Sequence, residues 1–291
     1  MKLIKYNSPN AVVKAIKELP SPYSKPPELD EYLLNMNTQI DKINDLLRID
    51  YAVVIRMFKL ANSVAMGGNE EKVLNINDAI TSVGSVEIAR ITEVSQKNPV
   101  LDVIPPQLFN LESFWNHSYA TAVAAEEIAK FIQEKNPEYH FICGLLHDIG
   151  RLIMSLAMPK QYIVCMLEAQ KKNRSLQSQE LRIFGFDHAE VGAEAIKEWK
   201  FPSFAEEAIE YHHAASDARK HPKLVTVTHL ADALIHALHI GRSGELMMPK
   251  IFSQKIQDIG INPYQLHDIS GRVLQKVSPR LIKGRNLSVA A

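Results

Sequence analysis

The chain has 291 residues, 46% of them hydrophobic and 23% charged, proportions that are typical of a folded globular protein and exclude a disordered one. Its 33 Lys and Arg residues balance its 33 Asp and Glu residues, so the formal net charge is zero. This balance argues against a surface for nucleic acid, because neutralising phosphates requires clustered Lys and Arg.

The two cysteines, Cys143 and Cys165, both lie within apolar helical patterns. A disulfide framework is therefore not expected, and the reducing cytoplasm fits this usage. No apolar run approaches the roughly 18 residues that a membrane-spanning helix needs. The N-terminal segment also lacks an apolar stretch followed by a small-residue cleavage site. We expect a cytoplasmic protein without membrane contact.

Helical periodicity dominates the first hundred residues. In residues 49–64, apolar side chains recur at the spacing of one buried helix face: Val53, Met57, Leu60 and Val64. Residues 75–91 repeat this behaviour, with an Asn or Asp available as a helix cap before Ala79. Period-2 alternation is short and rare along the whole chain, so the sequence predicts an all-α fold.

A change of composition marks a junction in the middle of this helical pattern. Residues 96–110 carry three prolines in fifteen positions and interrupt the helical period. We therefore predict two lobes, an N-terminal helical lobe of residues 1–105 and a C-terminal helical lobe of residues 106–291.

Three helices of the C-terminal lobe have recognisable beginnings or strong helix formers. Residues 113–135 are rich in Ala and predict one long helix. Asp187 and Glu190 form an aspartate version of the capping box before the next apolar segment. Ser203 and Glu206 have the same spacing, so we expect a capping box there as well.

Histidines are concentrated in this lobe, because only His117 of the eleven precedes residue 140. On its own, His117 fits a buried structural histidine better than a ligand. His147 and Asp148 close an apolar helical run, and an exposed helix end is the simple alternative for them. That alternative is disfavoured because Asp opposes the helix dipole at a C-terminus. A buried Asp without partners would cost several kcal/mol, so a cation or strong donor is expected beside it.

Other histidines and one aspartate add to this pattern. His188 follows the Asp187 cap at the first helical position, where polar residues are also tolerated without any function. His212 shares the apolar stripe of its helix, and His213 is its neighbour. Asp232 lies on an apolar helix with His229 and His236 at i−3 and i+4, so a local His–Asp–His face competes with a metal site.

Together these residues supply imidazole nitrogens and carboxylates from five predicted helices. A carboxylate such as Asp148 can bridge two cations, with imidazoles completing each coordination shell. This nitrogen-rich set suits Fe, Mn, Zn or Ni better than Ca or Mg. Two such ions about 3.5–4 Å apart would activate a bridging water for attack on phosphorus.

The order of these motifs resembles the HDOD domain family, within the HD superfamily of metal-dependent phosphohydrolases and related to HD-GYP domains. The resemblance rests on four motifs in order: Leu-Pro-x-Pro at 19–22, Leu-Ala-Asn-Ser at 60–63, Ala-Ile-x-x-x-Gly at 79–84 and His-Asp at 147–148. It spans roughly residues 10–280 and implies that the C-terminal lobe is an HD-type helical bundle.

The resemblance also implies roles for individual residues. It assigns a first metal to His117, His147, Asp148 and Asp232. It assigns a second metal to the bridging Asp148 with His188 and His212, and it directs His213 toward a third metal or a phosphate. Arg151 stands where related domains place a cation that touches substrate phosphate.

The segment after the adjacent histidines differs from the HD-GYP pattern. Ala214 replaces a Glu, Asp217 is retained, and no Gly-Tyr-Pro follows. The resemblance therefore implies a bacterial signalling or regulatory protein with one or two transition-metal ions, Fe slightly favoured. Its partner would be a signalling protein or a phosphate-containing small molecule.

Two alternatives stay open. One is an active phosphohydrolase on a nucleotide or cyclic dinucleotide, with Asp148, Arg151 and His213 as catalytic residues. In that case His213 would transfer protons and Arg151 would stabilise phosphate charge. The other is a structural metal site that holds the C-terminal lobe together. The sequence does not predict an oligomeric state.

Overall fold

The computed structural model describes residues 6–21, 25–65, 73–93, 100–251 and 253–281. Within these ranges every regular element is a helix and no strand occurs, which confirms the predicted all-α fold. The helices of the first hundred residues are α1 (Pro9–Lys14), α2 (Leu29–Leu34), α3 (Met36–Leu47), α4 (Tyr51–Ala65), α5 (Ile76–Val83) and α6 (Ser85–Thr92).

A short 3-10 helix, η1 (Leu101–Val103), leads into the second half of the chain. That half contains α7 (Leu111–Phe131), α8 (Pro137–Leu146), α9 (Ile149–Ala157), α10 (Pro159–Lys171), α11 (Leu176–Phe184), α12 (His188–Glu198), α13 (Ser203–Glu210), α14 (Pro222–Ala237), α15 (Ser253–Asp258), α16 (Pro263–Val277) and η2 (Ser278–Arg280). The predicted interruption of helical periodicity lies between α6 and α7, although residues 96–99 of it fall outside the described residues.

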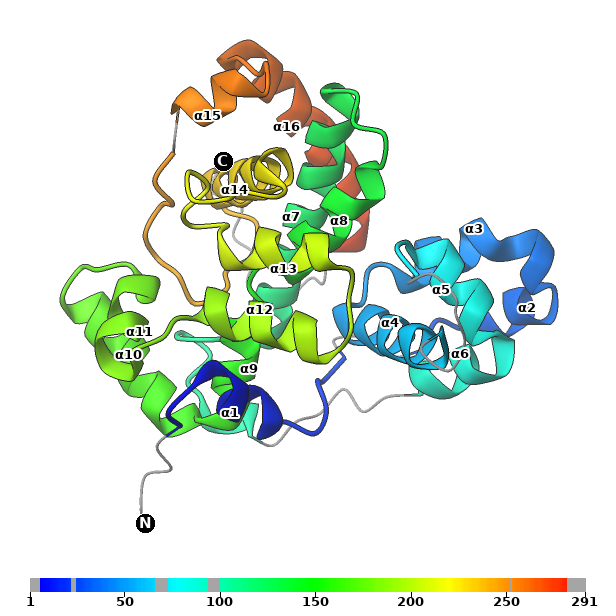
Figure 1. Ribbon diagram of the computed structural model, residues 1–291, viewed down its shortest axis with the longest axis horizontal. Helices are drawn as coiled ribbons and strands as arrows, with labels where there is room; N and C mark the ends of the chain where they lie inside the picture. Colours follow the sequence, from blue (N-terminus) through cyan, green and yellow to red (C-terminus); the bar gives the residue numbers. More distant parts are fainter. Residues whose placement is uncertain (1–5, 22–24, 66–72, 94–99, 252, 282–291) are drawn as a thin grey trace.

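Helices α2–α6 gather on one side of the molecule and α7–α16 on the other (Figure 1). The Trp115 indole Nε1 joins the two sides by donating to the Ile49 carbonyl at 2.7 Å. The rings of Phe58 and Phe201 stack with centroids 4.8 Å apart. Buried apolar side chains of both sides form one core. The division into lobes at residues 105 and 106 therefore stays a prediction.

Helix α1 lies against α9 and α12 of the second half, far from its neighbours in sequence (Figure 1). Its Asn10 side chain donates to the Glu194 carboxylate at 2.5 Å. Helix α1 thus packs on the two helices that begin after Asp148 and at His188.

Helix α7 is the long Ala-rich helix that the sequence predicts, and it packs against α8, α14 and α16. The Asn110 side chain caps its first turn by accepting the Ser113 N–H at 2.8 Å. Small residues allow the close crossing with α8, where a Cβ added at Gly144 would lie 2.7 Å from the Thr121 carbonyl oxygen. This crossing brings the end of α8 beside the middle of α7.

One stretch of the described chain, Pro137–Ala157, is long and apolar enough to cross a membrane by length and composition. However, 89% of its apolar window is buried within the protein. It is also interrupted between α8 and α9, and α8 packs against α7, α13 and α14. The stretch therefore forms part of the protein core.

Candidate metal centre

The break between α8 and α9 consists of His147 and Asp148. The His147 ring is fully buried and its Nδ1 lies 2.8 Å from the Gly144 carbonyl oxygen, which can only accept a hydrogen bond. Nδ1 therefore carries the proton in the neutral ring, and the lone pair of Nε2 is left for a metal. Asp148 occupies the N-cap position of α9, but its carboxylate makes no capping hydrogen bond.

Gly150 allows the start of α9 to touch the start of α12. A Cβ at this position would lie 1.9 Å from the His188 carbonyl oxygen, closer than any real contact. Because the backbones meet here, the His188 Nε2 reaches within 3.2 Å of Asp148 Oδ1.

The start of α12 is fixed by the predicted capping box of Asp187 and Glu190, which is confirmed in both directions. His188 is the first helical residue, as predicted. The predicted capping box of Ser203 and Glu206 is wrong. Pro202 occupies the N-cap of α13, so Ser203 is already inside the helix and its side chain does not cap it.

Four side chains form a first group, from α7, the α8–α9 break and α14. His117 Nε2 lies 3.1 Å from Asp232 Oδ1 and 3.3 Å from His147 Nε2. His147 Nε2 lies 3.3 Å from Asp148 Oδ2 and 3.5 Å from Asp232 Oδ1. His117, which on its own looked structural, is thus brought together with three other predicted ligands.

A second group lies around the other oxygen of Asp148. His188 Nε2 and His212 Nε2 lie 3.2 Å and 3.6 Å from Asp148 Oδ1. His213 Nε2 lies 2.9 Å from His188 Nε2. The Asp148 carboxylate therefore faces one group with Oδ2 and the other with Oδ1, which is the arrangement of a bridging ligand.

Several polar atoms of this cluster have no hydrogen-bond partner among the described residues and could instead be ligands of metal ions. Asp148 Oδ1, Asp232 Oδ1 and His212 Nε2 are buried and make no hydrogen bond of normal geometry within the described residues. Ligand atoms bound about 2.0–2.2 Å from one ion lie about 3–3.5 Å apart, which matches most of these separations. The residues present can hold a metal in each group.

The family of the chain follows from a comparison of its sequence with known domains. The HDOD domain pattern matches residues 19–215, about two thirds of the chain. The chain belongs to the HDOD domain family.

An uncharacterized protein of Treponema pallidum (strain Nichols) is 26% identical to this HDOD protein over 230 residues. The match covers 78% of this chain and 44% of that protein, so the chain spans less than half the length of this relative.

Solved structures share the fold of this HDOD protein. The MmoQ response regulator of Methylococcus capsulatus str. Bath is 22% identical, with a TM-score of 0.62, and the match covers 87% of this chain and 98% of that one. A virulence factor of Campylobacter jejuni subsp. jejuni is 18% identical, with a TM-score of 0.65 and coverage of 92% and 96%. An HDOD domain protein of unknown function from Geobacter sulfurreducens is 22% identical, with a TM-score of 0.55 and coverage of 93% and 95%.

In this HDOD protein, hydrogen bonds at Nδ1 orient two imidazoles of the second group, those of His188 and His212. The His188 Nδ1 lies 2.6 Å from Glu180 Oε2, and the His212 Nδ1 lies 2.6 Å from the Ile209 carbonyl oxygen. Carboxylate and carbonyl acceptors of this kind hold metal-binding histidines in one tautomer and one orientation. Both Nε2 atoms consequently point to Asp148.

The charges of the cluster are strongly coupled. Burial opposes ionisation of both carboxyl groups, yet the pKa of each is held well below its usual range. Arg151, His147 and His188 lower the pKa of Asp148. His117, His147 and His236 lower the pKa of Asp232. Burial alone would lower the pKa of His147, but Asp148 and Asp232 raise it to about 10. The carboxylates therefore stay ionised and attract positive charge, which protons or metal ions can supply.

Arg151 is buried, with 1% of its side chain exposed, and it contacts Asp148 Oδ2 at 3.2 Å through Nη1. Nη1 also donates to the Ser243 hydroxyl at 2.6 Å, and Nη2 lies 4.0 Å from Glu245 Oε2. Nη2 is 3.5 Å from His213 Nε2. The arginine expected to touch phosphate is thus already engaged by protein groups.

Ser243 and Glu245 belong to a segment that returns from the end of α14 to α7. Gly241, with φ +66°, lies so close to α7 that a Cβ would be 2.4 Å from the His117 amide nitrogen. The Arg242 N–H donates to the Ser113 carbonyl oxygen at 3.0 Å. Glycine is required at position 241 by both its backbone conformation and this approach.

Four residues of the site were not predicted as part of it: Glu180, His236, Ser243 and Glu245. His236 Nε2 lies 3.4 Å from Asp232 Oδ1, and it could also ligate a metal with His117 and Asp232. Its i+4 spacing from Asp232 was a usable signal, although it also fitted a local ion pair. His229 instead places its Nδ1 2.7 Å from the His212 carbonyl oxygen. The other three unpredicted residues, Glu180, Ser243 and Glu245, lie in segments without a distinctive sequence motif.

Proposed function

We propose that this HDOD protein is a signalling or regulatory module organised around a centre of two transition-metal ions. The observation that carries the proposal is burial, because each of six ligand side chains is no more than 2% exposed: His117, His147, Asp148, His188, His212 and Asp232. A centre so enclosed suits ions that control helix packing better than ions that meet a substrate.

In this proposal the first ion is held by His117, His147, Asp148 and Asp232. The second is held by Asp148, His188 and His212, with His213 beside it. Fe is slightly favoured over Mn, Zn and Ni, all of which accept imidazole and carboxylate ligands. Because the ligands come from α7, the α8–α9 break, α12, the end of α13 and α14, bound ions stabilise one arrangement of these helices. A signalling protein or a phosphate-bearing molecule would bind to that arrangement of the helices.

A second candidate function is metal-dependent hydrolysis of a phosphoester. The bridging geometry of Asp148 favours it, since two ions that share a carboxylate can activate a water for attack on phosphorus. His213, only half-buried, would transfer a proton, and Arg151 would bind phosphate charge. Arg151 could do so only after leaving Ser243 and Glu245, so this function requires the segment around Gly241 to move.

Metal analysis of untagged protein, combined with assays on cyclic dinucleotides and on bis-(p-nitrophenyl) phosphate, tests both functions. We expect about two ions per chain, a reduced content in Asp148→Ala, and no turnover. The matched control is Asp217→Ala, an exposed carboxylate outside the cluster, which should keep the full metal content.

Turnover that Asp148→Ala abolishes and Asp217→Ala retains would overturn the regulatory proposal in favour of the enzyme. A chain that binds no metal, and whose melting temperature is unchanged by Fe, Mn or Zn, would overturn both.

A further inference from the structure

A separate hollow of about 650 Å³ lies where the α7–α8 turn meets the N-terminal ends of α13 and α14. Its size is within the range of small-molecule sites. Helix α8 connects it with the metal centre, because His140 lines the hollow and His147 stands seven residues later. At 1.5 Å per residue, the two histidines are about 10 Å apart along the helix.

The charged side chains that line this hollow are mostly cationic. Three are lysines, Lys135, Lys220 and Lys223, and one is a carboxylate, Glu134. Lys223 Nζ lies 2.8 Å from Glu134 Oε1, so that single carboxylate is engaged by one lysine. The lining therefore carries an excess of positive charge even before any histidine is protonated.

The segment that presents Lys220 is held in place. The Glu207 carboxylate accepts the backbone N–H groups of Arg219 and Lys220 at 2.7 and 2.9 Å. Pro222 then begins the 16-residue helix α14, whose positive dipole end faces the same region. The positive charges are thus arranged by the fold around one concavity.

His140 provides an independent sign of a ligand. Its side chain is 96% buried, and its Nδ1 makes no hydrogen bond within the described residues. A buried polar atom without a partner costs free energy, and native proteins rarely keep one without a reason. Nδ1 is shielded from solvent in this ring orientation, so an acceptor oxygen in the hollow would supply the missing partner only after the imidazole turns toward it.

One wall of the hollow is aromatic. The rings of Tyr139 and Phe204 stack with centroids 4.3 Å apart and an interplanar angle of 13°. Aromatic groups therefore line the hollow together with the lysines. The combination fits an anion with or without a small organic group attached.

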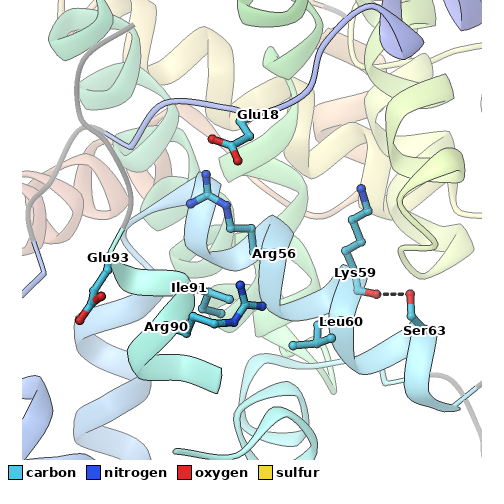
Figure 2. Close-up of a pocket in the computed structure, with 8 residues that line it drawn as sticks. All are labelled: Glu18, Arg56, Lys59, Leu60, Ser63, Arg90, Ile91 and Glu93. Carbon is cyan, nitrogen blue, oxygen red and sulfur yellow. Dashed lines mark hydrogen bonds between the residues drawn. The ribbon is translucent and has the colours of Figure 1, made fainter. Parts of the chain in front are cut away.

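A second hollow, of about 480 Å³ on the N-terminal helices, differs in its charge balance (Figure 2). Three cations and two carboxylates line it: Arg56, Lys59, Arg90, Glu18 and Glu93. Figure 2 shows the Arg56 guanidinium turned toward the Glu18 carboxylate. Burial lowers the pKa of Arg56, and the negative charges of Asp50 and Glu18 oppose that effect. Its positive charge is therefore more fully countered by the protein itself.

We propose that the hollow lined by Lys220, Lys223 and His140 binds a phosphate group, as free phosphate or as a small phosphomonoester. The lysines supply charge, and the His140 imidazole would supply a hydrogen bond after turning toward the bound oxygen. The site is distinct from the metal centre and does not depend on the function proposed for that centre.

Isothermal titration of the full-length protein with inorganic phosphate, adenosine 5′-monophosphate and adenosine tests this site. We expect one phosphate-dependent site, no binding of adenosine, and a loss of affinity of about tenfold or more in Lys220→Gln/Lys223→Gln. Tighter binding of the monophosphate than of free phosphate would identify the aromatic wall as part of the site. Equal affinities would identify free phosphate as sufficient.

The matched control is Lys171→Gln/Lys172→Gln, which removes two exposed lysines from the end of α10 and should leave the affinity within about twofold. Glu134→Gln frees Lys223 from its ion pair and should tighten phosphate binding. A misfolded variant would not bind phosphate more tightly. Phosphate affinity that is equal in wild type and in Lys220→Gln/Lys223→Gln would overturn the proposal. Binding of adenosine as tight as that of its monophosphate would overturn it as well.

Discussion

Two buried aspartates, Asp50 and Asp148, each precede a helix, yet their surroundings have opposite electrostatic effects. Burial raises the pKa of Asp50 to about 6, and the hydrogen bond from the Ser21 hydroxyl offsets this rise only in part. Burial acts on Asp148 in the same direction, but the Arg151 guanidinium and the His147 imidazole hold its pKa well below the usual range. Burial of a carboxylate is thus uninformative about function until its neighbours are known.

The two sites also differ in which groups the oxygens meet. Asp50 Oδ1 accepts the Ala52 and Val53 N–H groups at 2.9 and 3.3 Å and so caps the first turn of α4. Asp148 makes no such cap and turns both oxygens to imidazoles. The Asp50 carboxylate thus accepts hydrogen bonds from the backbone, whereas the Asp148 carboxylate contacts other side chains.

Replacing each aspartate by alanine should separate these roles most strongly. In chelator-treated protein, Asp148→Ala should cost about 3–5 kcal/mol of unfolding free energy, because it leaves Arg151 buried without its carboxylate. Asp50→Ala should cost about 0.5–2 kcal/mol, the usual value of a helix cap. Urea denaturation at neutral pH measures both, and equal losses would contradict the distinction.

The pH dependence of stability should reveal Asp50 specifically. Its pKa is about 6 in the folded protein and 3.8 as the reference value, so the folded state holds the proton more tightly. The stabilisation is fully present below about pH 4 and is lost as pH rises through about 6, a change on the order of 2–3 kcal/mol. Asp50→Asn should remove this slope.

The comparison should be made as the difference in unfolding free energy between wild type and Asp50→Asn from about pH 4 to pH 7. Subtraction removes the contributions of other carboxyl groups that titrate in this range. Parallel profiles would show that the Asp50 carboxyl has an ordinary pKa.

Gly150 distinguishes the surroundings of Asp148 from those of Asp50, because the close backbone contact at Gly150 places His188 beside Asp148. Gly150→Ala places a methyl group against the His188 carbonyl and should cost about 1–3 kcal/mol. The matched control is Gly271→Ala in α16, where nothing lies within 4 Å of the added Cβ and helix propensity should stabilise by about 0.5–1 kcal/mol. Thermal melts of both variants give the sign, and stabilisation by both would refute the close contact at Gly150.

Glu180 should have a smaller effect on the cluster than Asp148, because it holds the ligand His188 and is not itself a proposed ligand. Glu180→Gln weakens the acceptor that orients the His188 ring and should lower metal affinity about 10–100-fold. Glu168→Gln, at a partly exposed carboxylate in an ion pair with Lys172, should leave the affinity unchanged. Competition with a chromogenic chelator measures both variants. An unaltered affinity in Glu180→Gln would remove Glu180 from the site.

The helices could be predicted from sequence because they rest on local patterns, whereas the cluster could be predicted only from the order of the motifs along the chain. Periodicity identified α4, Asn75 caps α5 as expected, and the Asp187 cap placed His188 at the start of α12. The motif order then grouped ligands that no periodicity could bring together.

Long-range packing could not be predicted in the same way. Ser243 lies 92 residues from Arg151, in a segment without helical pattern, so nothing local linked the two. The docking of α1 on α12 is similar, since a six-residue helix says nothing about its distant partner. Ser203 failed as a cap because Pro202 already provides the extended residue before α13, and spacing alone does not distinguish the two positions.

The first group of ligands has a consequence for the timing of its assembly in the cell. His117 and Asp232, whose side chains meet at 3.1 Å, are 115 positions apart in the chain. At about 5–20 residues per second, a ribosome needs roughly 6–23 s to make the intervening segment. His117 leaves the ribosome long before Asp232 exists, so a nascent chain has no complete first group to offer. Binding of the proposed first ion by all four side chains therefore requires that α14 has docked on α7.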